Sequence, residues 1–324
     1  MVDVGLPEPI SVDTSTPPRI AYFIGGTNNS ALQASIAGAQ AGAAQIGATI
    51  DIFDANWDAN RMVGQMQTGL LSGYTAWVVA SPEGNQVCDS ITKDAPAANV
   101  LVSVVLVPIC GRDAAEGDDL HVPGMLTFVG GNETPAAFRA MVARAAEENP
   151  GNVKVGVITG PDVNPLTKNL KAMIADVQKD YPGFEVVAML PTDFSVPQGL
   201  EKATTLLQAN PDVDVIIAQY TNITRGVVAA LEAAGLNGKV RLYDSGGSKW
   251  SVEQIKAGNL RVTSGVYHFT NAKAAVLAIG DAWAGKEVPR AFLNDGQALI
   301  DGQEYGQPPL IDASNVDLYT AEVE

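Results

Sequence analysis

The stretch AYFIGGTNNSALQASIAGAQAGAAQIG, residues 21–47, carries the first structural signal of the chain. An apolar run ends at Gly25 and Gly26, a polar turn follows, and small residues then recur at helical spacing. The turn has neither the G-x-G-x-x-G pattern of dinucleotide-binding proteins nor the Gly-Lys-Ser/Thr of a phosphate loop. We interpret it as a strand-to-helix connection. Asn29 or Ser30 caps the helix, either as a cap alone or while also offering a side chain to a ligand.

The same alternation continues along the 324-residue chain. Short apolar runs rich in Val and Ile alternate with helix-period segments such as PAAFRAMVARAAEE (135–148). The runs span residues 19–25, 49–54, 76–80, 100–107, 126–129, 154–159, 185–190, 213–219, 240–243 and 260–266. Continuous apolar runs predict strands covered on both faces, and their alternation with helices predicts open, doubly wound parallel sheets of the α/β class. The series pauses at VGGNETP (129–135) and then restarts, which predicts two similar-sized halves.

Composition and charge argue against several classes of partner. The chain has 20 Lys and Arg against 36 Asp and Glu, a net charge of −16, which opposes binding to nucleic acid or to an anionic lipid surface. No apolar stretch approaches the roughly 18 residues of a membrane span. Residues 1–18 are acidic and Pro-rich, without the basic and apolar regions of a signal peptide, and they are predicted to form a mobile leader.

Polar residues gather where the predicted strands end, which is where open α/β sheets bind ligands. These ends are rich in Asn, Asp, Thr, Ser and Tyr and poor in Lys and Arg, so they offer neutral hydrogen bonds to hydroxyl groups. Two such halves would enclose a small polyhydroxylated ligand. Trp57 lies in one of these loops and offers a stacking face. The candidate ligand-binding residues at the strand ends are Asn28, Asn29, Glu83, Cys110, Asn164, Phe194, Tyr220, Asn222, Asp244, Tyr267 and His268.

The sequence predicts neither catalysis nor a metal site. His121 and His268 are the only histidines, so there is no His-x-x-x-His pair, and the G-x-S-x-G elbow of a serine hydrolase is absent. His268 follows Tyr267 at a strand end, and the sequence is compatible with either a ligand contact or a structural role for this histidine. The acidic residues at the strand ends form no recognisable set of acid, base and nucleophile. We therefore expect no enzymatic activity, no cofactor and no metal.

Cys88 and Cys110 follow the third and fourth predicted strands. If those strands are neighbours, both thiols lie at the same edge of one sheet. A disulfide there would close a loop of about 20 residues, stabilise the fold by roughly 3 kcal/mol and require an oxidising compartment. Two reduced, partly buried thiols are the alternative. The pair is a candidate disulfide on condition that the protein is exported.

Several stretches, in order along the chain, resemble the type I periplasmic sugar-binding proteins of ABC transporters, the group similar to ribose-binding protein. They are TNNSALQASIAGAQAGAAQIGATIDIFDAN (27–56), PTDFSVPQGLEKATTLLQANPDVDVIIAQYTNITRGVVAALEAAG (191–235), LYDSGGS (242–248), IKAGNLRVTSGVY (255–267) and ASNVDLYT (313–320). The resemblance implies two lobes that close on a ligand about a hinge of three crossovers, the third after Pro289. It places the N-terminal lobe at residues 19–131 plus 267–291 and the C-terminal lobe at residues 132–266 plus 292–324.

The resemblance also assigns roles to individual residues. Asn29 matches the family's binding Asn in the first turn, Phe194 matches its stacking aromatic residue, and Asp244 matches the Asp of its F-D-G turn. Lys168 stands near the family's binding Arg and is a further ligand candidate, while Tyr220 stands where the family has an Asn.

Some family positions differ in this chain. The aromatic pair that follows the first turn in ribose-type members is replaced by Ala31 and Leu32. The charged residues after the fourth strand are replaced by the apolar pair Leu106 and Val107. These changes weaken aromatic sandwiching of a pyranose ring and remove charged sugar contacts. An acyclic polyol, a sugar in a different pose or a less polar small molecule fits as well as a pentose.

The resemblance therefore implies an extracytoplasmic solute-binding protein, periplasmic or extracellular, that delivers a small neutral carbohydrate or polyol to an ABC transporter permease. It implies a monomer without cofactor or metal, attached to a membrane only through a lipid anchor that this chain does not contain. One alternative is the effector-binding domain of a sugar-responsive transcription regulator, which would need a basic helix-turn-helix of about 60 residues, whereas 18 residues precede Arg19. The other alternative is an α/β enzyme.

Overall fold

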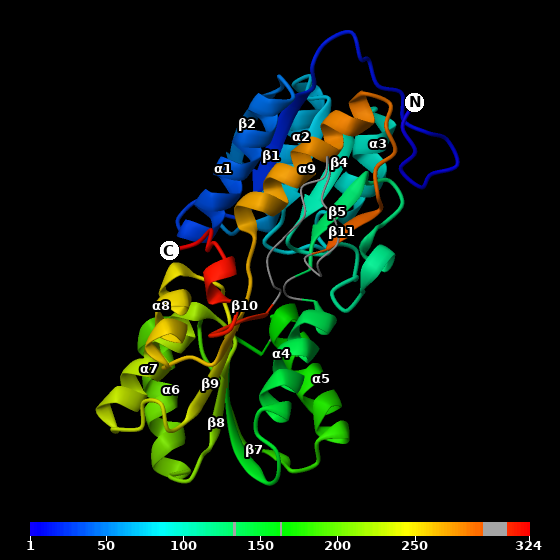
Figure 1. Ribbon diagram of the computed structural model, residues 1–324. Helices are drawn as coiled ribbons and strands as arrows, with labels where there is room; N and C mark the ends of the chain where they lie inside the picture. The colour runs from blue at the N-terminus through cyan, green and yellow to red at the C-terminus, as the bar shows by residue number, and fades with distance from the viewer. Residues whose placement is uncertain (132–133, 163, 294–309) are drawn as a thin grey trace. The chain divides into compact units, whose positions relative to one another are not determined.

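The computed structural model describes residues 1–131, 134–162, 164–293 and 310–324, which divide into two compact units (Figure 1). The first unit holds residues 1–131 and 267–293 of this part, and the second holds residues 134–266 and 310–324. Each unit is built on one six-stranded sheet with alternating strands and helices, so the predicted doubly wound α/β class is confirmed. Within these ranges, no helix is long and apolar enough to cross a membrane.

The sheet of the first unit has the strand order β11-β5-β4-β3-β1-β2, and all its neighbouring strands run parallel. Its strands are β1 (Arg19–Ile24), β2 (Thr49–Asp54), β3 (Ala76–Ala80), β4 (Leu101–Val105), β5 (Thr127–Gly130) and β11 (Ala291–Leu293). Its helices are α1 (Ser30–Gln45), α2 (Ala59–Leu71), the π-helix Ser90–Asp94, α3 (Ala95–Ala97), the 3-10 helix Gly117–Leu120 and α9 (His268–Trp283).

The continuous apolar runs are explained by packing on both faces of this sheet. Phe23 of β1 packs against Trp77 of β3, with ring centroids 5.1 Å apart, in a core that includes side chains of α2. The preceding residue, Tyr22, points the opposite way, and its hydroxyl lies 2.6 Å from Ser35 Oγ of α1. Figure 1 shows α9 beside α1. A Cβ atom at Gly38 of α1 would lie 2.0 Å from the Phe269 carbonyl oxygen, so the small residues of α1 allow the two helices to approach closely.

The sheet of the second unit has the order β12-β10-β9-β8-β6-β7, in which only β12 runs antiparallel to its neighbour. Its strands are β6 (Val153–Thr159), β7 (Phe184–Pro191), β8 (Val215–Ala218), β9 (Arg241–Ser245), β10 (Val262–Ser264) and β12 (Leu310–Asp312). Its helices are α4 (Pro135–Glu147), α5 (Pro165–Asp180), α6 (Val196–Ala209), α7 (Thr221–Ala233), α8 (Lys249–Ala257) and the 3-10 helix Val316–Leu318.

Two edge strands, β11 and β12, were not predicted from the sequence. Each is only three residues long, too short to produce an apolar run. β11 pairs in parallel with β5, with Phe292 opposite Val129, so residues 292 and 293 extend the first sheet. The predicted lobe boundary after residue 291 assigned these two residues to the C-terminal lobe. This boundary is wrong because it divides β11. Two passages between the units fall near residues 131–134 and 266–267, and the third lies outside the described residues.

The N-terminal segment before β1 is packed on the first unit, in contrast to the free leader expected from its composition. Val2 and Ile10 exchange two backbone hydrogen bonds of 2.8 and 2.9 Å. Their side chains and that of Val4 are buried, and Asp3 forms an ion pair of 2.6 Å with Arg290. Three separated apolar side chains are enough to anchor the segment, although they leave its overall composition acidic and Pro-rich.

Candidate ligand-binding site

The candidate residues lie at or next to the carboxyl-end edge of the sheet in their own unit. In the first unit, Asn28 and Asn29 follow β1, Glu83 follows β3 and Cys110 follows β4. In the second unit, the candidates follow the strands β6, β7 and β8 or end β9, and they are Asn164, Phe194, Tyr220 and Asp244. The architecture therefore brings each group together on one edge, as the parallel strands require.

Asn29 is the N-cap of α1. Its Oδ1 accepts a hydrogen bond of 2.9 Å from the backbone N–H of Leu32, which confirms the cap predicted from the sequence. The side chain is exposed, so the cap occupies its oxygen while its amide group lies at the surface of the edge. Asn28 is exposed too, and its Oδ1 accepts a hydrogen bond of 3.3 Å from the indole Nε1 of Trp57.

The turn after β1 and the loop after β2 are joined by Asp54. One carboxylate oxygen of Asp54 accepts a hydrogen bond of 2.7 Å from Thr27 Oγ1, and the other accepts one of 2.6 Å from the backbone N–H of Asn56. The hydroxyl of Thr27 and this backbone N–H lower the pKa of Asp54 below its ordinary value. The carboxylate is therefore charged at neutral pH and holds the two loops of the edge together.

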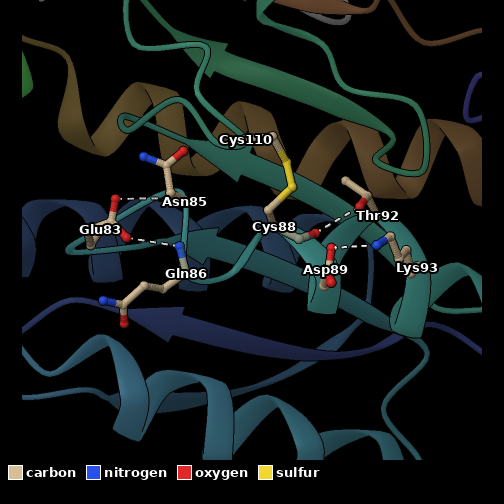
Figure 2. The surroundings of a disulfide bond; sticks show 8 residues. All are labelled: Glu83, Asn85, Gln86, Cys88, Asp89, Thr92, Lys93 and Cys110. Atoms are coloured by element: carbon tan, nitrogen blue, oxygen red, sulfur yellow. Dashed lines mark hydrogen bonds and ion pairs between the residues drawn. A yellow bond between two sulfur atoms is a disulfide. The ribbon is translucent and has the colours of Figure 1, made fainter.

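The carboxylate of Glu83 stabilises the loop in which it lies. Its two carboxylate oxygens accept hydrogen bonds of 3.1 and 2.9 Å from the backbone N–H groups of Asn85 and Gln86 (Figure 2). This arrangement makes Glu83 a loop-forming residue whose oxygens already have donors. The sequence could not separate this local use of a carboxylate from ligand binding, because both place an acidic residue in a strand-end loop.

Cys88 and Cys110 form a disulfide, which confirms the candidate pair (Figure 2). Their Cα atoms lie 5.1 Å apart, and β3 and β4, which precede them, are neighbours in the sheet. The loops are also in direct contact, because a Cβ atom at Gly84 would lie 2.0 Å from the carbonyl oxygen of Pro108. Since the sulfur of Cys110 is bonded, its thiol is not available to a ligand, and the residue contributes to the edge by fixing two loops.

Phe194 and Tyr220 form the aromatic part of the second edge. Their rings lie edge to face, with centroids 6.1 Å apart and an angle of 86° between the planes. Phe194 has a left-handed backbone, with φ of 65°, and its ring lies on the backbone of Gly160. A Cβ atom at Gly160 would lie 1.9 Å from Phe194 Cζ, so glycine is required there. Both aromatic side chains are half-buried.

Asn164 caps α5, where its Oδ1 accepts hydrogen bonds of 2.8 and 3.4 Å from the backbone N–H groups of Leu166 and Thr167. Beside it, Gln219 Oε1 accepts from Gly160 N and from Thr167 Oγ1, both at 2.8 Å. Gln219 is buried and ties the end of β8 to the end of β6. Gln219 was not among the predicted site residues, because a Gln at a strand end is equally typical of a solvated turn.

Asp244 is fully buried at the end of β9. Its Oδ2 accepts a hydrogen bond of 2.8 Å from Thr224 Oγ1 of α7, and its Oδ1 has no hydrogen-bond partner among the described residues. Burial raises the pKa of Asp244 to about 6, against the opposing effect of the Thr263 and Thr224 hydroxyls. A carboxylate held in this way is a strong acceptor for a hydroxyl group that reaches it.

The turn after Asp244 is held by the C-terminal part of the chain. Tyr319 donates a hydrogen bond of 2.7 Å to the Gly247 carbonyl oxygen, and Gly247 N donates one of 3.0 Å to Thr263 Oγ1. Gly247 has φ of 50°, which favours glycine. The turn that follows Asp244 is therefore held in a fixed conformation.

The remaining candidates lie at helix starts. Tyr267 is buried and precedes α9, and His268 is the first residue of that helix. Burial lowers the pKa of His268 to about 4, so its imidazole is neutral at pH 7. Lys168 and Asn222 lie in the first turns of α5 and α7 with exposed side chains. Over the described part of the chain, no three His, Cys, Asp or Glu side chains group in a way that could hold a metal ion.

Comparisons with known proteins agree with this architecture. The family model of the periplasmic binding protein domain matches residues 20–287. A D-ribose/D-allose-binding protein of Pseudomonas aeruginosa is 24% identical over 225 residues, which are 68% of this chain and 65% of the relative, just under two thirds of its length.

Two solved structures show the same fold at low sequence identity. An ABC transporter periplasmic solute-binding protein from Actinobacillus succinogenes, with bound D-allose, superposes with a TM-score of 0.77 at 20% identity, covering 93% of this chain and 100% of that one. An ABC transporter solute-binding protein from Bacillus halodurans, with bound myo-inositol, gives 0.78 at 17% identity, covering 95% and 99%. Since the family model spans most of its length, the chain belongs to the periplasmic binding protein domain family, which is made of binding proteins and not of enzymes.

Proposed function

We propose that the protein is an extracytoplasmic solute-binding protein that captures a small neutral carbohydrate or polyol at the carboxyl-end edges of its sheets for an ABC importer. The observation that carries this proposal is the second edge, where the aromatic pair Phe194 and Tyr220 lies on the same sheet edge as the cap Asn164 and the buried carboxylate of Asp244. An aromatic face together with neutral donors and one buried acceptor suits a ligand that has both C–H faces and hydroxyl groups.

The polar groups at this edge suit hydroxyl groups better than a formal anion. Asn164 and Tyr220 offer an amide and a phenol, and Asp244 offers a carboxylate oxygen, which would repel a phosphate or carboxylate ligand. Lys168 is the one cation in the candidate set, and its side chain is exposed. The D-allose and myo-inositol bound by two structural neighbours belong to the ligand class that this edge would accept.

Membership of a periplasmic binding protein family places the protein outside the cytoplasm, and the Cys88–Cys110 disulfide is consistent with an oxidising compartment. We further propose that the partner is an ABC transporter permease, that the protein acts as a monomer, and that any membrane attachment is through a lipid anchor. The permease would distinguish the ligand-bound form by its altered conformation.

A thermal-shift screen tests the ligand class. D-ribose, D-allose, myo-inositol, glycerol and acyclic pentitols are added separately at 1 mM to the purified protein, with glutamate and phosphate as anionic controls. A ligand present at 100 times its Kd adds about 2.7 kcal/mol to the free energy of unfolding, which is a readily measured rise in Tm. At least one neutral carbohydrate or polyol is expected to raise Tm. Stabilisation by an anion alone would contradict the proposal.

Replacement of Phe194 by Ala is expected to weaken binding of the stabilising ligand about 30-fold. The substitution removes the ring that lies on Gly160, and truncating a central aromatic contact typically costs about 2 kcal/mol of binding free energy. The measurement is an equilibrium titration. Leu200→Ala is the matched control, because Leu200 is an exposed apolar residue of neighbouring α6. Equal affinities of Phe194→Ala and wild type would remove Phe194 from the site.

A further inference from the structure

The strand-end edge of the first unit has one aromatic side chain whose position is not explained by packing alone. Trp57 lies in the loop between β2 and α2 and is 54% exposed, and it is the only aromatic side chain classed as exposed in the described ranges. We propose that Trp57 is the ligand-stacking residue of the first unit, the structural counterpart of Phe194 in the second. The inference rests on the proposed function and adds a specificity-determining residue to it.

The two sheets have equivalent connectivity around this point. In the first sheet, β1 is the second strand from one end and β2 is the edge strand beside it. In the second sheet, β6 and β7 hold the same two places, so β1 corresponds to β6 and β2 to β7. The turns after β1 and β6 correspond as well. Asn29 and Asn164 are each the fifth residue after the strand ends, and each caps the following helix.

Trp57 and Phe194 occupy the same place in the next loop of each unit. Each is the third residue after its strand, β2 or β7, and each immediately precedes the N-cap of its helix, Asp58 or Ser195. Each also has a left-handed backbone, with φ of 62° for Trp57 and 65° for Phe194. A bulky residue in this conformation is uncommon, and its recurrence at equivalent positions points to a shared requirement for where the ring lies.

Each ring lies on a glycine of the turn that follows the first strand of its unit. Phe194 lies on Gly160 of the turn after β6, and Trp57 lies on Gly26 of the turn after β1, where a Cβ atom would be 2.8 Å from Nε1 and 3.0 Å from Cε2. The indole is also held by its hydrogen bond to Asn28 and by the hydrogen bond of 2.6 Å from its own backbone N–H to the Gly25 carbonyl oxygen. The ring is thus fixed on the backbone of the edge while much of its surface stays exposed.

Trp57 also compensates for the aromatic pair that ribose-type members have where this chain has Ala31 and Leu32. In this chain neither residue has a ring, and both side chains are buried in the first turns of α1. An aromatic face on the first unit therefore has to come from another loop, and the loop after β2 supplies it. An indole offers a larger face than a phenyl ring and suits the C–H face of a cyclic sugar or cyclitol.

The test uses titrations of wild type and four variants with D-ribose, D-allose and myo-inositol. Trp57→Ala is expected to weaken binding of the ligand that wild type accepts by about tenfold or more, while Trp57→Phe stays within about threefold because a ring is retained. Leu71→Ala, which truncates an apolar side chain that is 90% exposed on α2, is the matched control and keeps wild-type affinity. Gly26→Ala is the fourth variant, because its Cβ displaces the indole without removing it, and it is expected to weaken binding as well.

Tryptophan fluorescence gives a readout that a purely structural role would not change. Bound ligand is expected to protect wild type from acrylamide quenching, and Trp57→Phe is expected to lose the part of this protection that Trp57 provides. Trp77 is fully buried, and the half-buried Trp250 and Trp283 give the same background in both proteins. If wild type binds a probe and Trp57→Ala binds it with equal affinity, this inference is wrong while the proposed function stands. If wild type binds none of the three probes, nor glycerol or an acyclic pentitol, both the proposed function and this inference are overturned.

Discussion

The Asp244→Asn variant is expected to be more stable than wild type at pH 7 and yet to bind ligand about tenfold more weakly or worse. The carboxylate is fully buried, one of its oxygens has no partner among the described residues, and its pKa is raised to about 6 from an ordinary value of 3.8. A neutral amide of the same shape avoids the cost of burying a charge. The same change removes a charge-assisted acceptor for a ligand hydroxyl, which is worth roughly 1.5–3 kcal/mol.

The stability gain depends on pH in a defined direction. Because the pKa of Asp244 is higher in the folded state, the folded protein holds the proton more tightly than the unfolded chain does. The stabilising contribution of the wild-type Asp244 is fully present below pH 4 and is lost as the pH rises through about 6, at about 1.4 kcal/mol for each unit of pKa difference. The stability gain of Asp244→Asn over wild type therefore grows as the pH rises. The ligand-free wild type should therefore lose up to about 3 kcal/mol from this group between pH 4 and pH 7, and Asp244→Asn should lack that component.

Urea unfolding at several pH values measures the stability change, and titration with the ligand measures binding. Asp317→Asn is the control, because Asp317 is 87% exposed and lies outside the candidate site, and its effect should stay within about 0.5 kcal/mol. Loss of both stability and binding in Asp244→Asn would assign the carboxylate a structural role. Gain of stability with unchanged affinity would remove it from the site.

Loss of the Cys88–Cys110 disulfide is expected to lower the free energy of unfolding by about 3 kcal/mol. The bond links residues separated by 22 positions, and a closed loop of that length restricts the unfolded chain by about this amount. It also joins the loops after β3 and β4 at the strand-end edge, so ligand affinity should fall together with stability. Denaturant unfolding of oxidised wild type and of the double variant Cys88→Ala, Cys110→Ala measures the difference.

The thiol content of the oxidised protein supports or refutes this prediction independently. No free thiol should react with a thiol reagent before unfolding and reduction, since both cysteines are bonded. Two reactive thiols in protein purified from an oxidising compartment would show that the bond does not form there. Equal stability of wild type and the double variant would show that the bond does not restrict the unfolded chain.

Much of the fold follows from local sequence patterns. The apolar runs predicted strands β1 to β10. Strands β3, β4 and β8 are buried along their whole length, which leaves a continuous apolar signal, whereas the outer strands β2 and β7 are only partly buried. The cap at Asn29 and the disulfide could also be predicted, because each involves residues that closely follow a predicted strand. The edge strands β11 and β12 escaped prediction because each is only three residues long, and the pairing of β11 with β5 joins parts of the chain that are distant in sequence.

The site was less predictable because the roles of its residues depend on long-range contacts. Glu83 and Asp244 have the same sequence signature, an acidic residue at a strand end. In the structure, Glu83 accepts hydrogen bonds from the backbone of its own loop, whereas Asp244 is buried and accepts one from Thr224. Gln219 joins two strand ends through hydrogen bonds that no spacing rule indicates. The correspondence of Trp57 with Phe194 appears only when the two sheets are compared strand by strand.

Isothermal titration of the wild-type protein with D-allose, D-ribose and myo-inositol tests the central claim most directly. The account predicts saturable binding of at least one of them with one molecule per chain, and a marked loss of that binding in Phe194→Ala and in Asp244→Asn. Absence of binding for all three and for acyclic polyols, together with saturable binding of an anionic or strongly apolar compound, would contradict it.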